Sequence, residues 1–270
     1  MPLRLFLQIL AIETKKAVSY RMDFWLGAVG SLLAGIGVPY FTWQAIYAAR
    51  GTPLLGGYTF AGMVAYAIAC TLIIKVVRGS DLTLGIANDI YDGTLNRYLV
   101  YPAGYLRFKF AQQCGVLTPS LLQLALVGGA FLLVLPQPAD LAITPTSVAQ
   151  ALLSMAAANV LHFLICYPVQ LVAFWADNVW SLIVMLRFIS SLLGGGLIPL
   201  ELFGAEAREW LGYLPFAHLY WTPVSALLGK LTMAEWLASL ATTGLWCLAC
   251  ALVGRVLWRR GQLQYSGIGM

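Results

Sequence analysis

The stretch Arg78–Lys109 reads RGSDLTLGIANDIYDGTLNRYLVYPAGYLRFK and is the one long polar interruption between segments that are otherwise apolar. Ile86 and Ile90 stand one helical turn apart, and Gly93 breaks the pattern before a second apolar run near Tyr98. The spacing predicts a helix, a tight turn and a second short helix. We expect this elbow, residues 78–109, to lie at the surface of a membrane.

The composition around the elbow is that of an integral membrane protein. Of 270 residues, 60% are hydrophobic and 10% are charged, and the mean hydropathy is +0.80. A helical span needs about 20 apolar residues, so the length allows about six spans. The apolar runs are long and do not alternate, which disfavours a β-barrel. The net charge of +5 comes from residues at the ends of the runs, so we expect no nucleic-acid partner.

The apolar runs predict a single all-α domain, residues 1–270, with six transmembrane helices. The predicted spans are residues 24–48, 58–77, 110–135, 146–175, 179–199 and 235–258. Residues 1–23 mix apolar and basic side chains, which predicts an amphipathic helix on the inner surface with its basic residues toward anionic membrane lipids. Residues 194–230 consist of apolar pieces shorter than a bilayer crossing and interrupted by Gly and Pro, which predicts short re-entrant outer helices between spans five and six.

Basic residues orient this arrangement, because cytoplasmic loops carry an excess of Lys and Arg. With both termini inside, the following residues fall at the inner side: Arg4, Lys15, Lys16, Arg21, Lys75, Arg78, Arg97, Arg107, Lys109, Arg255, Arg259 and Arg260. Arg50, Arg208 and Lys230 fall outside. We therefore expect a multi-pass protein of the cytoplasmic (inner) membrane with both termini in the cytoplasm.

Three polar residues lie within the predicted spans. Asn159 and His162 share a helix face and either form a polar patch toward a substrate path or make hydrogen bonds between helices. Arg187 lies near the middle of the fifth span, where a charge needs a partner. It can pair with a carboxylate, reach a lipid phosphate or bind an acidic group of a substrate.

The elbow resembles a segment of the permease subunits of ABC-2 type transporters. Ile90, Gly93, Leu95, Leu99 and Pro102 fit the pattern I-x-x-G-x-L-x-x-x-L-x-x-P of that family. The resemblance implies a cytoplasmic coupling element on which a separate ATPase subunit docks. An ordinary amphipathic loop helix is the alternative reading of the same residues.

The resemblance also implies roles for individual residues of the elbow. Asp89 and Asp92 would meet basic residues of the ATPase, and Gly93 would permit the turn. Leu95 and Tyr98 would fill an apolar cleft of the ATPase as anchors, with Pro102 closing the motif.

The outer segment resembles the same family in pieces. Pro199 follows a run of glycines, and Leu214-Pro215-Phe216 with Pro223 and Gly229 matches the family's outer helices. The chain has Phe203-Gly204 where the family usually has Phe-Pro, so the turn at this place is expected to differ. The tail after Trp258 is similar to that of a branch with paired permease subunits.

These features favour the permease subunit of an ATP-driven exporter for a drug, lipid, glycan or peptide. The sequence has no G-x-x-x-x-G-K-[ST] phosphate loop, so ATP and Mg²⁺ would bind to two copies of a separate ABC ATPase. A second permease subunit, identical or related, would complete the transporter. No catalytic, cofactor-binding or metal-ligating residue is expected in this chain, and its five cysteines all lie in apolar runs.

Two other classes fit the sequence less well. An ion-coupled secondary transporter is expected to carry carboxylates within its spans and an inverted repeat. A membrane-embedded lipid-modifying enzyme is expected to bring His, Asp or Glu side chains together near an interface. The sequence shows neither pattern.

Overall fold

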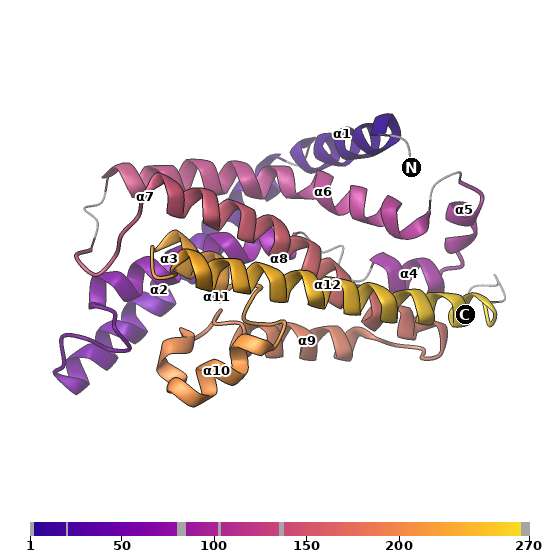
Figure 1. The fold of residues 1–270 in the computed structure, drawn as a ribbon. Helices are drawn as coiled ribbons and strands as arrows, with labels where there is room; N and C mark the ends of the chain where they lie inside the picture. The colour runs from indigo at the N-terminus through magenta and orange to yellow at the C-terminus, as the bar shows by residue number, and fades with distance from the viewer. Residues whose placement is uncertain (1–2, 20, 80–84, 102–103, 135–137, 266–270) are drawn as a thin grey trace.

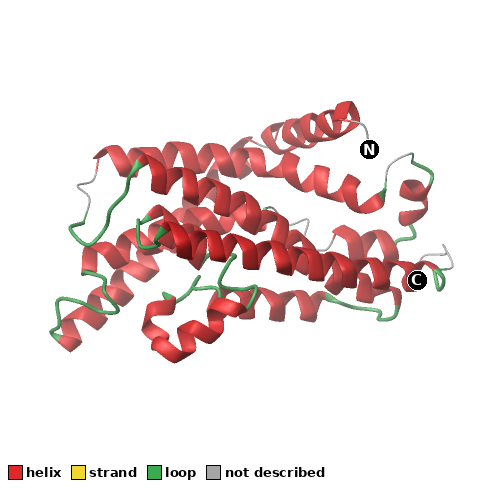
Figure 2. Cartoon of the chain, in the orientation of Figure 1, coloured by secondary structure: helices red, strands yellow, loops and turns green. Residues whose placement is uncertain are grey.

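The computed structural model describes residues 3–19, 21–79, 85–101, 104–134 and 138–265, and these fold into helices joined by short loops (Figures 1 and 2). In chain order the helices are α1 (Leu3–Ser19), α2 (Arg21–Arg50), α3 (Phe60–Arg78), α4 (Gly85–Tyr91), α5 (Leu95–Leu99), α6 (Tyr105–Gln123), the π-helix η2 (Leu124–Gly128), α7 (Gly129–Val134), α8 (Pro145–Leu171), the 3₁₀ helix η3 (Val172–Phe174), α9 (Trp180–Leu193), the 3₁₀ helix η4 (Leu200–Phe203), α10 (Ala205–Tyr213), α11 (Trp221–Leu227) and α12 (Met233–Gln262).

Four helical segments in the described part of the chain are long and apolar enough to cross a membrane. They are Phe60–Arg78, Tyr105–Phe131, Pro145–Phe174 and Met233–Gln262. Together with the composition, they make this an integral membrane protein. The 30-residue α2 and the 14-residue α9 are the further candidates for the six predicted spans.

Two predicted boundaries were wrong. The fifth span was expected to reach residue 199, but α9 ends at Leu193 because the chain turns back at Gly194, whose carbonyl accepts a hydrogen bond from Trp221 N at 2.9 Å. The elbow was expected to run to residue 109, but α6 already begins at Tyr105. Lys109 therefore belongs to a helix and is buried in the bundle.

The long helices run side by side, and the short helices gather at or between their ends. Both termini and the pair α4–α5 lie at one end of the bundle, which we call the elbow end (Figure 1). The loop between α7 and α8 lies at the opposite end, which we call the far end (Figure 1). In the bundle, α12 and α11 pack on α8, α1 packs on α6, and α2 packs on α3.

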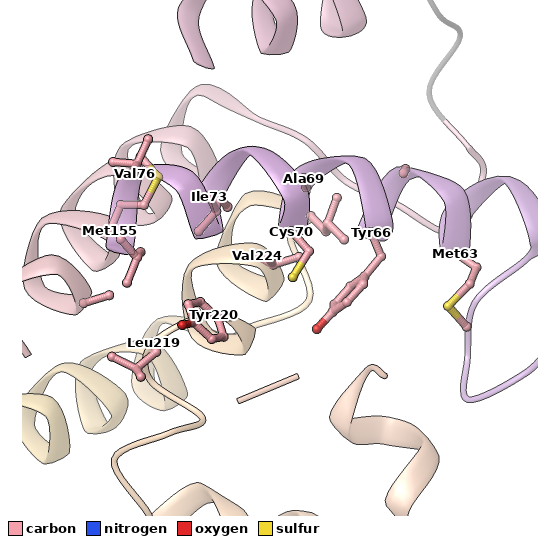
Figure 3. Packing of buried hydrophobic residues seen from close by; sticks show 14 of the residues in the cluster. Met63, Tyr66, Ala69, Cys70, Ile73, Val76, Met155, Leu219, Tyr220 and Val224 are labelled. Carbon is pink, nitrogen blue, oxygen red and sulfur yellow. The ribbon is translucent and has the colours of Figure 1, made fainter. Parts of the chain in front are cut away.

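Helix α3 is the centre of the main core. Of the 18-residue apolar stretch of α3, 61% is buried inside the protein, whereas the corresponding figure for α12 is 11%. Most of the surface of α12 is therefore left for lipid or for another subunit. One face of α3 meets the segment that leads into α11, with Tyr220 and Val224 opposite Cys70 and Ile73 (Figure 3). The Tyr66 hydroxyl donates a hydrogen bond of 2.7 Å to Gly195 O, which fixes the turn after α9 to α3.

At the far end, a carboxylate fastens the loop before α8 to the start of α3. Asp140 accepts hydrogen bonds from Thr59 N at 3.0 Å and from Thr59 Oγ1 at 2.7 Å. The Thr59 side chain also caps α3 by accepting from Gly62 N at 3.0 Å. Burial raises the pKa of the Asp140 carboxyl, but the hydrogen bonds from Thr59 outweigh this, and its pKa lies below the usual 3.8.

We expect Asp140→Asn to lower the thermal stability of the protein at pH 7 by roughly 1 kcal/mol, or about 2–4 °C, because one charge-assisted hydrogen bond is lost. A carboxyl with a depressed pKa stabilises the fold above its unfolded pKa, and this contribution disappears as the pH falls through the folded pKa. The melting difference between wild type and Asp140→Asn should therefore shrink toward pH 3. Melting curves in detergent at pH 7, 5 and 3 measure it. A difference that stays constant over this range contradicts the assignment.

Candidate functional site

The elbow is a folded unit whose first helix is held by α8. The apolar side chains Ile86, Ala87 and Ile90 of α4 are buried against α8 and η3. In the first turn of the helix, Ile86 N donates to Gln170 Oε1 at 3.0 Å. Because an unsatisfied N–H at a buried helix start is costly, this glutamine of α8 fixes where α4 begins.

The turn between the two short helices is built on a glycine. Gly93 has φ of +69°, in the left-handed region that side chains with a Cβ rarely adopt. Its N–H donates to Ile90 O at 3.3 Å, and its carbonyl accepts from Asn96 N at 3.4 Å. The glycine thereby closes α4 and starts α5 within a few residues.

A buried ion pair ties the elbow to α6. Asp89 Oδ2 lies 2.6 Å from Lys109 Nζ, and the two side chains are 13% and 8% exposed. The same carboxylate accepts from Tyr105 Oη at 2.6 Å and from Thr94 Oγ1 at 3.2 Å. Asp89 is therefore paired inside the chain, and its expected contact with basic residues of a partner stays a prediction.

Leu95 is likewise an internal residue. Its side chain is fully buried in the cluster that joins the elbow to α8 and η3. The side chain is covered within this chain, and its expected role as an anchor in a cleft of another protein stays a prediction. The family pattern identifies Leu95 from local spacing alone, whereas the residues that cover Leu95 lie elsewhere in the chain.

Tyr98 is half-buried within a group of aromatic rings. Its ring lies 5.2 Å from that of Phe108 and 5.5 Å from that of Tyr105, and Lys109 Nζ lies 4.7 Å from its centroid. Burial raises the pKa of Tyr98, and the nearby Asp89 carboxylate adds to this, so the phenol is neutral at physiological pH. Tyr98 therefore supports the elbow from within and presents one edge outward.

The outward face of the elbow carries Leu99 and Asp92, which were singled out from the sequence, and three side chains that were not. Val100 is 84% exposed, and Leu99 and Tyr101 are about half exposed. Asp92 and Arg97 are exposed beside them. We call these five residues, Asp92, Arg97, Leu99, Val100 and Tyr101, the elbow face. Pro102, the last residue of the motif, lies outside the described residues.

A polar pocket separates the elbow from α1. It has a volume of about 330 Å³. Glu13 and Lys16 of α1 line one side, and Arg97, Tyr98 and Tyr101 line the other. The elbow face therefore continues into a hollow that a protruding side chain of a partner can enter.

The polar residues of α8 are used inside the bundle. Asn159 Nδ2 donates to Val76 O at 3.2 Å and to Val77 O at 3.1 Å, which satisfies the last carbonyls of α3. His162 is buried, with Nε2 3.7 Å from Cys166 Sγ. Of the two readings of Asn159, the structure supports the hydrogen bond between helices.

An arginine that the sequence placed at the inner boundary reaches across the bundle instead. Arg78 Nε donates to Tyr220 Oη at 2.8 Å, and its terminal nitrogen contacts Ser191 Oγ and donates to Arg187 O at 3.4 Å. Arg187 itself is half-buried on α9. Arg78 thus links the end of α3 to α9 and to the segment before α11.

The outer prolines shape the segment between α9 and α12. Pro199 is buried and precedes η4, Pro215 is buried in the turn after α10, and Pro223 occupies the first turn of α11, where a missing N–H costs little. Phe216 is half-buried against the main core. Gly204 has φ of +86°, which a proline cannot adopt, so the turn before α10 differs from one built on Phe-Pro.

The described residues hold no group of three or more His, Cys, Asp or Glu side chains that could bind a metal ion. A family model described as "ABC-2 family transporter protein" matches residues 33–269. A comparison with curated proteins found no match.

Proposed function

Because the chain belongs to the ABC-2 family of transporter proteins, we propose that it is the permease subunit of an exporter whose ATP is hydrolysed on a separate ATPase. ATP and Mg²⁺ would bind to two copies of that ATPase, and a second permease subunit, identical or related, would complete the path. The transported compound would be a drug, lipid, glycan or peptide that leaves the cell.

The elbow face is the observation that carries the proposal. It is an ordered surface with exposed apolar residues, and it lies at the end of the bundle that also carries both termini (Figure 1). Exposed apolar groups rimmed by charges mark places where proteins bind one another. We propose that the ATPase docks here, with Val100 and Tyr101 as apolar contacts and Asp92 and Arg97 as the polar rim.

The distribution of basic residues supports a cytoplasmic position for the elbow end. Arg97 and Arg107 lie in and beside the elbow, and Arg259 and Arg260 lie in the last turn of α12. Lys230 lies at the far end, where its Nζ donates to Gly57 O at 2.9 Å. Since Lys and Arg accumulate on the cytoplasmic side, we place the elbow and both termini in the cytoplasm of a cell with the protein in its inner membrane.

The contacts of the elbow give a route for force from the ATPase into the membrane. Gln170 connects α4 to α8, and the Asp89–Lys109 pair connects it to α6. A displacement of the elbow therefore moves two spanning helices together. Since packed elements shift as units, such a movement would change the angle between them and open or close a path at the subunit interface.

Co-expression with its ATPase tests the proposal. We expect the full-length chain to co-purify with an ABC ATPase and to show no ATP hydrolysis when purified alone, because the sequence has no phosphate loop. Phosphate release with and without vanadate measures this. Vanadate-sensitive hydrolysis by the isolated chain, confirmed free of ATPase by mass spectrometry, would contradict it.

A further inference from the structure

The C-terminal half of α1 is joined to α6 by hydrogen bonds. Thr14 Oγ1 donates to Gly115 O at 3.1 Å, and Gln112 Nε2 donates to Glu13 Oε1 at 3.1 Å. The helices approach so closely here that a Cβ at Gly115 would lie 2.6 Å from Glu13 Cβ. Toward its N-terminus α1 diverges from α6 (Figure 1).

The divergence leaves a groove with a volume of about 580 Å³. Its walls are α1 and α6, its floor is α8, and its lining is apolar apart from one residue. The lining residues are Leu3, Phe6, Leu106, Arg107, Phe110, Val160, Phe163 and Leu164. The rings of Phe110 and Phe163 lie 5.2 Å apart at the floor. An apolar cavity of about 150 Å³ already binds a benzene ring, so this groove has room for a longer hydrocarbon chain.

The charged residue of the lining is a cation. Arg107 is exposed at the rim of the groove, and Arg4 is exposed on the neighbouring turn of α1. Among the described residues, no acidic side chain lines the groove. A guanidinium pairs with phosphate through two parallel hydrogen bonds, and it does so best where one side is shielded from water.

The groove therefore combines an arginine that can bind phosphate, Arg107, with an apolar lining. One of its walls is the amphipathic helix α1. Helices of this kind lie at the boundary between headgroups and acyl chains. We propose that the groove binds one acyl chain of an anionic phospholipid whose phosphate pairs with Arg107. The bound lipid fills the space between the free half of α1 and α6, and so fixes the angle of α1.

This site does not depend on the exported compound or on the ATPase. The elbow face lies outside the groove, and none of its residues lines it. The lipid contact therefore remains testable on the purified chain even if the proposed transport function is wrong.

Native mass spectrometry of the full-length chain tests the proposal. The chain is purified in detergent with either phosphatidylglycerol or phosphatidylcholine of identical acyl chains. We expect one retained phosphatidylglycerol per chain and about tenfold weaker retention of phosphatidylcholine, since both lipids carry the phosphate but the choline cation neutralises the headgroup and repels Arg107. Equal retention of the two lipids by the wild-type protein overturns the proposal.

Variants assign the binding to the groove. Arg107→Gln should remove the preference for phosphatidylglycerol, whereas Arg97→Gln, an exposed arginine of the elbow, should keep it. Val160→Trp places a large ring in the groove and should reduce the retention of both lipids, with an unchanged melting temperature showing that the variant is folded. Retained preference in Arg107→Gln, or full retention in a folded Val160→Trp, overturns the proposal. So does a cysteine cross-link at Phe6 that places a second copy of the chain in the groove.

Discussion

Replacing Val100 and Tyr101 together by aspartate should abolish ATPase stimulation while leaving the permease folded. Val100 is 84% exposed and Tyr101 about half exposed, so the exchange removes no buried side chain, although it takes away the ring contacts of Tyr101 with Tyr98 and Phe108. In an interface, two buried carboxylates without partners cost far more than the about 1.4 kcal/mol that corresponds to a tenfold loss of affinity. We expect at least about a tenfold loss in substrate-stimulated hydrolysis and in co-purified ATPase.

Leu263→Asp is the matched control. Leu263 is 88% exposed and follows α12 at the same end of the bundle, but it lies outside the elbow face. If this variant uncouples the ATPase and the double variant of Val100 and Tyr101 does not, the docking site is on the tail instead. Size-exclusion profiles and melting temperatures of the isolated permease separate lost docking from lost folding.

Replacing Lys109 by methionine should destabilise the elbow by about 3–5 kcal/mol, because it leaves the Asp89 carboxylate buried without its cation. Asp89→Leu should cost a similar amount, since the lysine then remains unpaired. The double variant should recover part of the loss, because an apolar pair of similar size does not have to be desolvated as ions, while Tyr105 Oη and Thr94 Oγ1 lose their acceptor. The melting temperatures of the wild type, the two single variants and the double variant, measured in detergent, give this double-mutant cycle.

The readout distinguishes an ion pair that holds the elbow from one that faces a partner. If Asp89 were a docking residue, Asp89→Leu would reduce binding of the ATPase without changing the melting temperature of the isolated chain. A strictly additive cycle, with the double variant as unstable as the sum of the single variants, contradicts the coupling that we assign.

The two short helices of the elbow and the turn between them could be predicted from the sequence because their signals are local. The spacing of Ile86 and Ile90 predicts a buried helix face, and a glycine between two apolar runs predicts a tight turn. Both features depend on residues a few positions apart. The family resemblance then pointed to the same stretch as the coupling element, and that role stays a prediction.

The roles of Asp89 and Leu95 could not be predicted, because their surroundings are set by distant residues. Asp89 is paired with a lysine that the sequence had assigned to the loop, and Leu95 is covered by a cluster that includes Leu171 and Phe174. Val100 was read as part of an apolar run, and nothing in its neighbours tells whether such a run is covered. Arg78 fits the charge rule for an inner boundary, yet it bonds to Tyr220, 142 residues later.

The same dependence on distant residues sets the order of events during synthesis. The N–H of Ile86, in the first turn of α4, donates to Gln170. Tyr105 stacks on Trp258 with ring centroids 4.9 Å apart. Phe174, in the same cluster, also meets Tyr265. Residues 85–101 leave the ribosome long before these partners exist, so the packing behind the elbow face is completed only when α12 has been made. If an ATPase docks on this face as we propose, it would bind full-length chains in preference to truncated ones.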